Sequence, residues 1–275
     1  MPRRREPASG EISCALPGNL AAPKIQVDCV RNELQRVGQA LGELAGKKLD
    51  DDLVMNGIRA ANKVRRLLDA LRRAVYSAPA APLPALEMLV AEMLAIHFCS
   101  DREETIAVLD GLLAEVQARI RQNQFVMNAD AVRIFWVNPV ADLRAMNLLE
   151  ELGARICGSD YMFTHALDLI PEDLPPLEAL ARVALADPMV GPTTDRAGRI
   201  VRECQAGRAE AVVVSRIPGA SHCAREGEII REIVRQQIGI PVIELEIPPV
   251  CDAMLPNLGS RLQALFETAR ARRTK

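Results

Sequence analysis

The first half of the chain carries the apolar spacing of helices. Apolar residues recur every three to four positions, as on one face of a helix: Val30, Leu34, Val37, Leu41 and Leu44. The short apolar and polar alternation that is typical of half-buried strands does not occur in this half. We therefore predict a helical region over 27–125, after a flexible amino-terminal segment over 1–26 that is rich in Pro, Gly and Arg and holds a loop at 16–24.

Boundary residues divide this helical region. Gly46 supplies a stop after the first helix, and Asp50 or Asp51 can cap the second. Two more helices are expected over 85–97 and 104–121. Together the four helices are predicted to pack as a bundle.

From residue 126 the pattern changes to short apolar runs that alternate with amphipathic helices. Four runs have the length and composition of buried strands: 132–137, 154–158, 211–214 and 242–245. This alternation is typical of a parallel sheet that is covered on both faces. The sequence therefore predicts an α/β fold, in which the helical region is followed by a small doubly wound parallel-sheet domain over 126–275.

Composition narrows the functional classes. The net charge is −2 with 25% charged residues, so bulk electrostatics do not indicate a nucleic-acid partner. No apolar run reaches the roughly 20 residues that cross a bilayer, and the basic start has no apolar segment behind it. With seven cysteines and no secretory signal, we expect a cytoplasmic protein with reduced thiols.

The loops after the strands offer the candidate chemistry. Crossover connections in parallel sheets are right-handed, so these loops gather on one edge of the sheet. Asn138 and Asp142 follow the first strand, and either cap the next helix, which is the favoured interpretation, or face a ligand. Cys157, Cys223 and Cys251 come at or after the ends of the other three strands, although each thiol alone is typical of a buried core residue.

Sequence spacing gives no independent sign of a metal. The chain has neither a Cys-x-x-Cys pair nor two histidines at metal-binding spacing, so a metal site would draw its ligands from distant loops. Glycine-rich phosphate loops are also absent from the sequence.

Three stretches of the chain are similar to one known family. They are ELQRVGQALGELAGKKLDDDLVMNGIRAANKVRRLL, WVNPVADLRAMNLLEELGARI, and the closing REIVRQQIGIPVIELEI with LGSRLQALFETAR. Together, over about Val27 to Arg273, they resemble the 2-hydroxyacyl-CoA dehydratase family. This family includes subunits of (R)-2-hydroxyacyl-CoA dehydratases and of ATP-dependent benzoyl-CoA reductase.

The resemblance implies a radical enzyme that acts on acyl-CoA thioesters. Family subunits pair into heterodimers, and the catalytic subunits hold a [4Fe–4S] cluster through three cysteines. A separate ATP-hydrolysing activator with its own iron–sulfur cluster delivers single electrons. In the dehydratases the electron forms a ketyl radical on the thioester carbonyl, which acidifies the β-proton and lets the 2-hydroxyl leave. In the reductases the electrons enter the aromatic ring.

The resemblance also assigns candidate site residues. Cys223 lies near the third cluster cysteine of the family, whereas Met162 stands where another ligand cysteine is expected and Cys157 lies about five residues earlier, within a strand. Family members carry an additional amino-terminal α/β domain that contributes the first cysteine, and here only about 26 residues precede the helical region. Contacts to CoA are suggested by charge alone, and a solvated helix face is favoured for the first two of three arginines: Arg196, Arg199 and Arg216.

Three interpretations stay open at this point. The chain is a subunit that cooperates with a homologous cluster-bearing partner, whether or not it binds iron itself. Alternatively, it is an autonomous catalytic subunit that uses Cys157, Cys223 and one more thiol. The third interpretation is a cluster-free relative that acts as an acyl-CoA-binding or scaffold protein. The Met at position 162 favours the first over the second.

Overall fold

The computed structural model describes residues 3–97, 101–161, 163–220, 226–249 and 252–273. By its internal contacts the chain forms two compact units, which are both discontinuous in sequence. Unit 1 comprises residues 1–66 and 165–192, and unit 2 comprises residues 67–164 and 193–275. The boundaries at residues 26 and 125 of the predicted regions stay predictions, since these units follow spatial contacts and not chain order.

Unit 1 is built on a hairpin that the sequence did not predict. Strands β1 (Ser13–Leu16) and β2 (Leu20–Pro23) pair antiparallel around a 3-10 turn (η1, Pro17–Asn19), where Gly18 and Asn19 both have positive φ. The predicted loop at 16–24 is therefore wrong over β2, because the turn residues reverse the chain and let its apolar side chains pack inward. The hairpin packs with helices α1 (Lys24–Ala45) and α6 (Pro176–Ala186).

Helices α1 and α2 (Asp51–Ser77) confirm the predicted boundaries. Gly46 ends α1 in the left-handed conformation, and its N–H donates to backbone carbonyls of the last turn. The Asp50 side chain accepts a 2.8 Å hydrogen bond from the Leu53 N–H at the start of α2. Helix α2 then passes from unit 1 into unit 2 at residues 66 and 67.

The other two predicted helices are present as α3 (Ala85–His97) and α4 (Arg102–Arg121). Asp101 caps α4 by accepting from the Glu104 N–H at 2.9 Å. The packing partners of α1 and α3 within each unit come from the second half of the chain, which the predicted bundle did not include. Helix α1 packs on α6 within unit 1, and α3 packs on α5 within unit 2.

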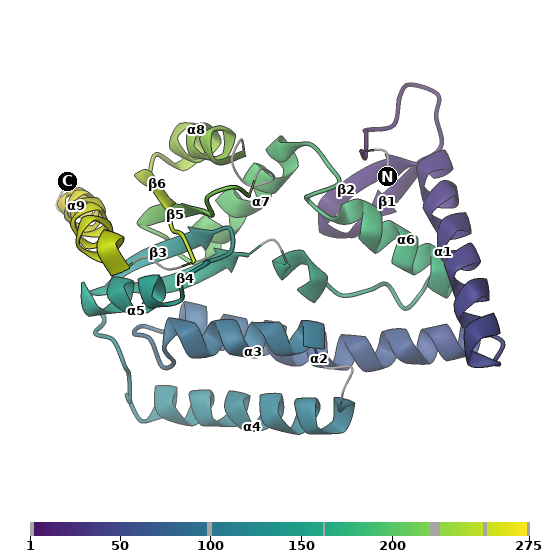
Figure 1. Ribbon diagram of the computed structural model, residues 1–275, viewed down its shortest axis with the longest axis horizontal. Helices are drawn as coiled ribbons and strands as arrows, with labels where there is room; N and C mark the ends of the chain where they lie inside the picture. The colour runs from purple at the N-terminus through teal and green to yellow at the C-terminus, as the bar shows by residue number, and fades with distance from the viewer. Residues whose placement is uncertain (1–2, 98–100, 162, 221–225, 250–251, 274–275) are drawn as a thin grey trace. The chain divides into compact units, whose positions relative to one another are not determined.

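Unit 2 confirms the predicted parallel sheet (Figure 1). Its strands lie in the order β4-β3-β5-β6, and each neighbouring pair is parallel. All four fall where the apolar runs were found: β3 (Val132–Val137), β4 (Ala154–Asp160), β5 (Ala211–Arg216) and β6 (Val242–Glu246). The two central strands are almost fully buried, as expected for a sheet that is covered on both faces.

Helices cover the two faces of this sheet (Figure 1). On one face α5 (Arg144–Glu151), α9 (Leu255–Arg273) and the start of α3 pack around Trp136, Met146 and Phe266. On the other face α7 (Thr193–Ala206) and α8 (Glu226–Ile238) pack around Phe135, Ile200 and Val234. The doubly wound arrangement predicted from the sequence is therefore confirmed.

The strand order reverses between β3 and β5. The chain leaves β3 toward β4 on one side, and leaves β5 toward β6 on the other side. In open α/β sheets, ligands bind outside the carboxyl ends of the strands at such a reversal. The fold thus directs attention to the segments after β3 and β5. Within the described residues, no helix has both the length and the apolar content of a bilayer span.

Close packing of the sheet edge gives a first test. A methyl group on Gly158 in β4 would lie 2.7 Å from two ring carbons of Phe135, where β3 and β4 also shift register. We expect Gly158→Ala to lower the free energy of unfolding by about 1–3 kcal/mol, because the buried ring has little room to move. Urea denaturation measures this change.

Gly111→Ala is the matched control, because Gly111 lies in α4 with no heavy atom within 4 Å of the added methyl. This control should be neutral or stabilising by up to about 1 kcal/mol. Equal stabilities of the two variants would contradict the packing described for β4.

Candidate functional site

A buried arginine joins three segments at the carboxyl edge of the sheet. The Arg196 side chain on α7 donates from Nε to Asp160 Oδ2 at 2.9 Å, from Nη1 to Glu226 Oε2 at 2.6 Å, and from Nη2 to Asn138 Oδ1 at 2.8 Å. Arg196 itself is 0% exposed. The guanidinium therefore links the ends of β3 and β4 to the start of α8.

Asn138 fixes the reversal point between β3 and β5. It follows β3 directly with a φ of 73°, a left-handed conformation that Asn tolerates better than most residues. Its backbone N–H donates to Asp160 O at 2.8 Å, and its Nδ2 donates to Ser215 O at 2.9 Å. The favoured capping interpretation is wrong for Asn138, because its side chain joins neighbouring strand ends.

Asp142 does hold the start of the next helix. Its Oδ1 accepts from the Arg144 N–H at 3.1 Å, and its carboxylate also pairs with the Arg144 guanidinium at 2.6 Å. This bond lies in the first turn of α5, as capping predicted.

Ser215 closes the edge on the β5 side. The indole N–H of Trp136 donates to Ser215 Oγ at 3.1 Å, and this hydroxyl lies 2.8 Å from Pro139 O, which can accept its proton. Trp136 and Ser215 are both buried. Ser215 therefore satisfies the indole and the loop backbone together, and locks β3 to β5 at their carboxyl ends.

The electrostatics of this edge are set by one guanidinium between two carboxylates. Burial lowers the pKa of Arg196, but Asp160 and Glu226 outweigh it, so the pKa is raised and the side chain stays charged. Glu226 is also held by the Thr193 hydroxyl at 3.2 Å. Each of the three guanidinium nitrogens of Arg196 thus already donates a hydrogen bond to a protein side chain.

A second polar cluster is buried beside β4. Glu92 of α3 is 0% exposed and pairs with Arg72 of α2, accepts from the Tyr76 hydroxyl at 3.1 Å and lies 3.4 Å from Ser159 Oγ. Burial raises the pKa of Glu92, although its bonds to Arg72 and Tyr76 oppose this. Arg72 also donates to the Ser159 hydroxyl at 3.2 Å. The cluster therefore holds the carboxyl end of β4, an edge strand of the sheet.

The described thiols behave as core residues. Cys157 lies within β4 at 1% exposure, and burial raises its pKa to about 12. Cys204 of α7 is equally buried, and its pKa is raised for the same reason. Both thiols therefore pack as core residues, which is the role that Cys157 was expected to have on its own. Of the remaining described cysteines, Cys14 is buried in unit 1 and Cys29 is exposed.

The candidate thiols Cys223 and Cys251 lie outside the described residues, as does Met162, which stands where the resemblance expects a ligand cysteine. Among the residues that the structure describes, no three His, Cys, Asp or Glu side chains gather as a metal site. A [4Fe–4S] cluster held by three thiolates therefore does not fit the described part of the chain.

The three arginines suggested by charge have different surroundings. The predicted solvated helix face is wrong for Arg196. Its side chain is buried, because carboxylates on neighbouring segments pair with it. Arg199 is partly exposed and pairs with Glu203 one turn along α7 at 2.8 Å. Arg216 ends β5 with its side chain 39% exposed, and its guanidinium lies 3.4 Å from the Glu246 carboxylate.

Unit 1 has a separate pocket of about 580 Å³. Most of its lining comes from apolar residues of the hairpin and of the segment before α6. Two arginines also line it, Arg66 of α2 and Arg182 of α6. These arginines pair with Glu172 at 2.6 Å and with Glu178 at 2.5 Å. The pocket is thus mainly apolar, and each of its two arginines is paired with a glutamate.

Comparison with protein families identifies the class. Residues 14–269 match the HGD-D family, described as 2-hydroxyglutaryl-CoA dehydratase, D-component. Because the match covers nearly all of the 275 residues, the chain belongs to this family, as the sequence motifs had suggested. The comparison with curated proteins finds no match.

Sequence reasoning missed the partners of Arg196. Neither Asp160 nor Glu226 was singled out from the sequence. The available signal was their position, since each carboxylate stands where a predicted strand or helix meets the expected ligand edge. Glu92 gave no signal, because a single acid in an apolar helix also suits an exposed position.

Removing the central guanidinium tests the edge network. We expect Arg196→Met to lower the free energy of unfolding by about 3–5 kcal/mol, because it leaves two carboxylates without their buried partner. Urea denaturation at neutral pH measures the loss.

The control is Arg231→Met on α8, where an exposed pair with Glu228 at 2.9 Å contributes at most about 1 kcal/mol. A loss for Arg196→Met no greater than that of the control would contradict a structural role for the network.

Thiol burial predicts selective alkylation. In the native protein at about pH 8, iodoacetamide should modify Cys29 and leave Cys157 and Cys204 unmodified, because both buried thiols are protonated and covered. Peptide mass spectrometry distinguishes the sites, and protein unfolded in urea serves as the control in which all three react. Native labelling of Cys157 at the rate of Cys29 would refute this assignment.

Proposed function

We propose that the chain is a subunit of a 2-hydroxyacyl-CoA dehydratase-type enzyme and works with a homologous cluster-bearing partner. The observation that carries this proposal is the family match over residues 14–269. The parallel sheet supports it, because its strand order reverses beside an organised carboxyl edge, where such folds place their ligands. The substrate class is then an acyl-CoA thioester.

The partner is inferred from the thiols. Three thiolates are needed to hold a [4Fe–4S] cluster, and the two described thiols in unit 2 are buried and protonated. Met162 also occupies the position at which the family resemblance expects a ligand cysteine. We therefore place the cluster in the partner subunit, where it would supply single electrons received from an ATP-dependent activator with its own iron–sulfur cluster.

The reaction in this proposal is the loss of water from a 2-hydroxyacyl-CoA to give the 2,3-unsaturated thioester. Hydroxide leaves carbon 2 and a proton leaves carbon 3, so the overall change is redox-neutral and the electron is returned. Ring reduction of benzoyl-CoA is the related reaction of the wider family. This chain would contribute the walls of the acyl-CoA site from the loops after β3 and β5.

Arg216 is the arginine that suits a CoA phosphate at this edge. Arg196 is fully engaged with Asp160 and Glu226, whereas the Arg216 side chain is more than one-third exposed and only weakly held by Glu246. An exposed guanidinium can turn to a phosphate at little cost. The same arrangement favours, as a second function, a cluster-free relative that binds acyl-CoA without redox work, since neither the sheet nor Arg216 requires iron.

The isolated chain should lack a stoichiometric cluster. After anaerobic expression of the chain alone, we expect far less than four iron atoms per chain, no EPR signal of a reduced [4Fe–4S] centre, and no dehydration of 2-hydroxyacyl-CoA. The physical reason is that Cys157 and Cys204, the thiols of unit 2 that the structure describes, are buried, and that Met162 stands where a ligand cysteine is expected.

Cys223→Ser, with Cys29→Ser as its control, tests whether the chain alone can hold a cluster. If the chain alone holds a full cluster that Cys223→Ser removes and Cys29→Ser retains, the partner-subunit proposal fails. A colourless chain that binds acyl-CoA, and that neither pairs with nor activates a homologous cluster-bearing subunit, would instead establish the second function.

A further inference from the structure

The helix that follows β3 opens on an exposed arginine. Arg144 is the first residue of α5, and its side chain is 48% exposed. Its Nε donates to Asp142 Oδ1 at 3.0 Å, and its Nη2 donates to Asp142 Oδ2 at 2.6 Å. Asp142 is itself buried and also accepts from the Arg144 backbone N–H. One edge of the guanidinium is therefore held in a bidentate pair by a buried carboxylate.

The other edge of this guanidinium has a more exposed partner. Nη1 of Arg144 donates to Asp252, which follows β6 and whose side chain is 67% exposed. Exposed ion pairs contribute little to stability, because water and salt screen them. Asp142 thus fixes where the guanidinium lies, whereas Asp252 is a partner that another anion can replace.

The Arg144–Asp252 pair joins segments that follow two strands separated by β5. Arg144 comes after β3 and Asp252 after β6, and β5 lies between these strands in the sheet. In open α/β sheets, ligands bind outside the carboxyl ends of the strands where the strand order reverses, here between β3 and β5. The loop before α5 is held at this point, since Pro139 O lies 2.8 Å from Ser215 Oγ. The outer edge of Arg144 therefore belongs to the part of the fold that suits a ligand.

Arg144 is positively charged at physiological pH. Its hydrogen bonds with Asp142 and Asp252 raise its pKa, and a guanidinium keeps its proton in proteins even without such help. A charged, planar group that is oriented on one edge and exposed on the other suits the recognition of an oxyanion, since little side-chain freedom is left to lose on binding.

We propose that Arg144 binds an oxyanion of the acyl-CoA ligand, which replaces Asp252 at Nη1. This assignment rests on the proposed function and adds a further binding residue to it. The oxyanion is either a phosphate of the CoA part or a carboxylate at the end of the acyl chain, and the guanidinium fork suits both. In the free protein Asp252 pairs with the binding edge of Arg144, and it releases this edge when the ligand arrives.

A purely structural ion pair predicts a different result. If Arg144 and Asp252 only stabilise the fold, the loss of either partner acts on stability alone, in the same direction. If a ligand replaces Asp252, the two substitutions act on ligand affinity in opposite directions. Arg144→Gln then removes the binding group, whereas Asp252→Asn removes the anion that competes with the ligand.

Isothermal titration of the full chain at about 0.15 M salt separates these cases, with CoA, butyryl-CoA and glutaryl-CoA as ligands. Arg144→Gln should raise the dissociation constant by about 10-fold or more, because a charge-assisted hydrogen bond is lost. Asp252→Asn should lower it by about two- to five-fold, which is the contribution of an exposed ion pair. Equal weakening of all three ligands by Arg144→Gln assigns a phosphate, and weakening of glutaryl-CoA alone assigns the acyl carboxylate.

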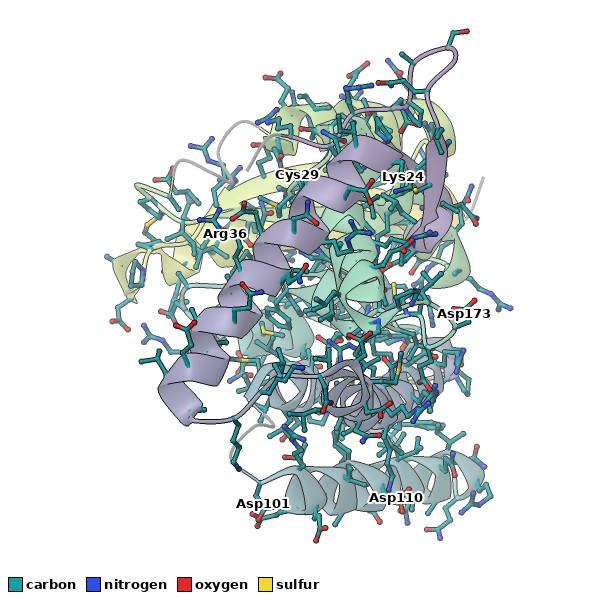
Figure 2. The ribbon with its side chains drawn as sticks, turned by 90° about the vertical axis from the view of Figure 1, so that its right-hand side faces the viewer. Lys24, Cys29, Arg36, Asp101, Asp110 and Asp173 are labelled. Carbon is teal, nitrogen blue, oxygen red and sulfur yellow. The ribbon has the colours of Figure 1, made fainter. Side chains whose placement is uncertain are left out.

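Arg119→Gln and Glu115→Gln are the matched controls. They disrupt an exposed pair of 2.9 Å on α4, the helix that Asp101 and Asp110 mark in Figure 2. Each control changes the net charge as one of the test variants does, but away from the carboxyl edge of the sheet. Both should keep the dissociation constants of the wild type.

Wild-type affinity in Arg144→Gln, or no gain of affinity in Asp252→Asn, overturns the proposal and leaves the acyl-CoA role of the chain intact. A wild-type chain that binds none of the three ligands overturns the acyl-CoA role and this site together. Arg144→Lys keeps the charge without the planar fork and should weaken binding less than Arg144→Gln. Thermal unfolding of every variant verifies that each is folded during the titration.

Discussion

The buried guanidinium of Arg196 is the interaction on which the carboxyl edge of the sheet depends. Three segments that are distant in sequence end there: β3 with Asn138, β4 with Asp160, and α8 with Glu226. Each brings an oxygen that is costly to bury alone, and Arg196 offers a donor to each. A planar fork of donors suits this task better than an ammonium group, so lysine would not replace it.

This network also frames the part of the chain with the best cluster candidate. The segment that contains Cys223 leaves the sheet after Ser215 and Arg216 and joins α8 at Glu226. Ser215 is held through Trp136 and Asn138, and Glu226 through Arg196 and Thr193. Both points of attachment are therefore fixed by buried groups. The described residues on either side of this segment therefore lie beside the reversal of strand order.

The sequence predicted the periodic elements well, because apolar spacing follows directly from burial. All four strands of the parallel sheet were located, and the helix stop at Gly46 and the helix cap at Asp50 follow from local backbone chemistry. The hairpin before α1 was missed, because each of its strands has only four residues, too few for a clear apolar pattern. The Arg196 network was missed because its members are far apart in sequence and each has an ordinary local role. Pairing across such distances comes from topology, which a single sequence does not contain.

The central claim is that this chain acts as one subunit of an acyl-CoA dehydratase whose cluster lies in a homologous partner. Anaerobic affinity purification of the full chain from its native cells, followed by iron and sulfide analysis and a 2-hydroxyacyl-CoA dehydration assay, tests it most directly. We predict that a homologous subunit co-elutes in equal amount, carries the iron, and gives a preparation that is active with its ATP-dependent activator. Elution of this chain alone with a complete [4Fe–4S] cluster and full activity would contradict the account.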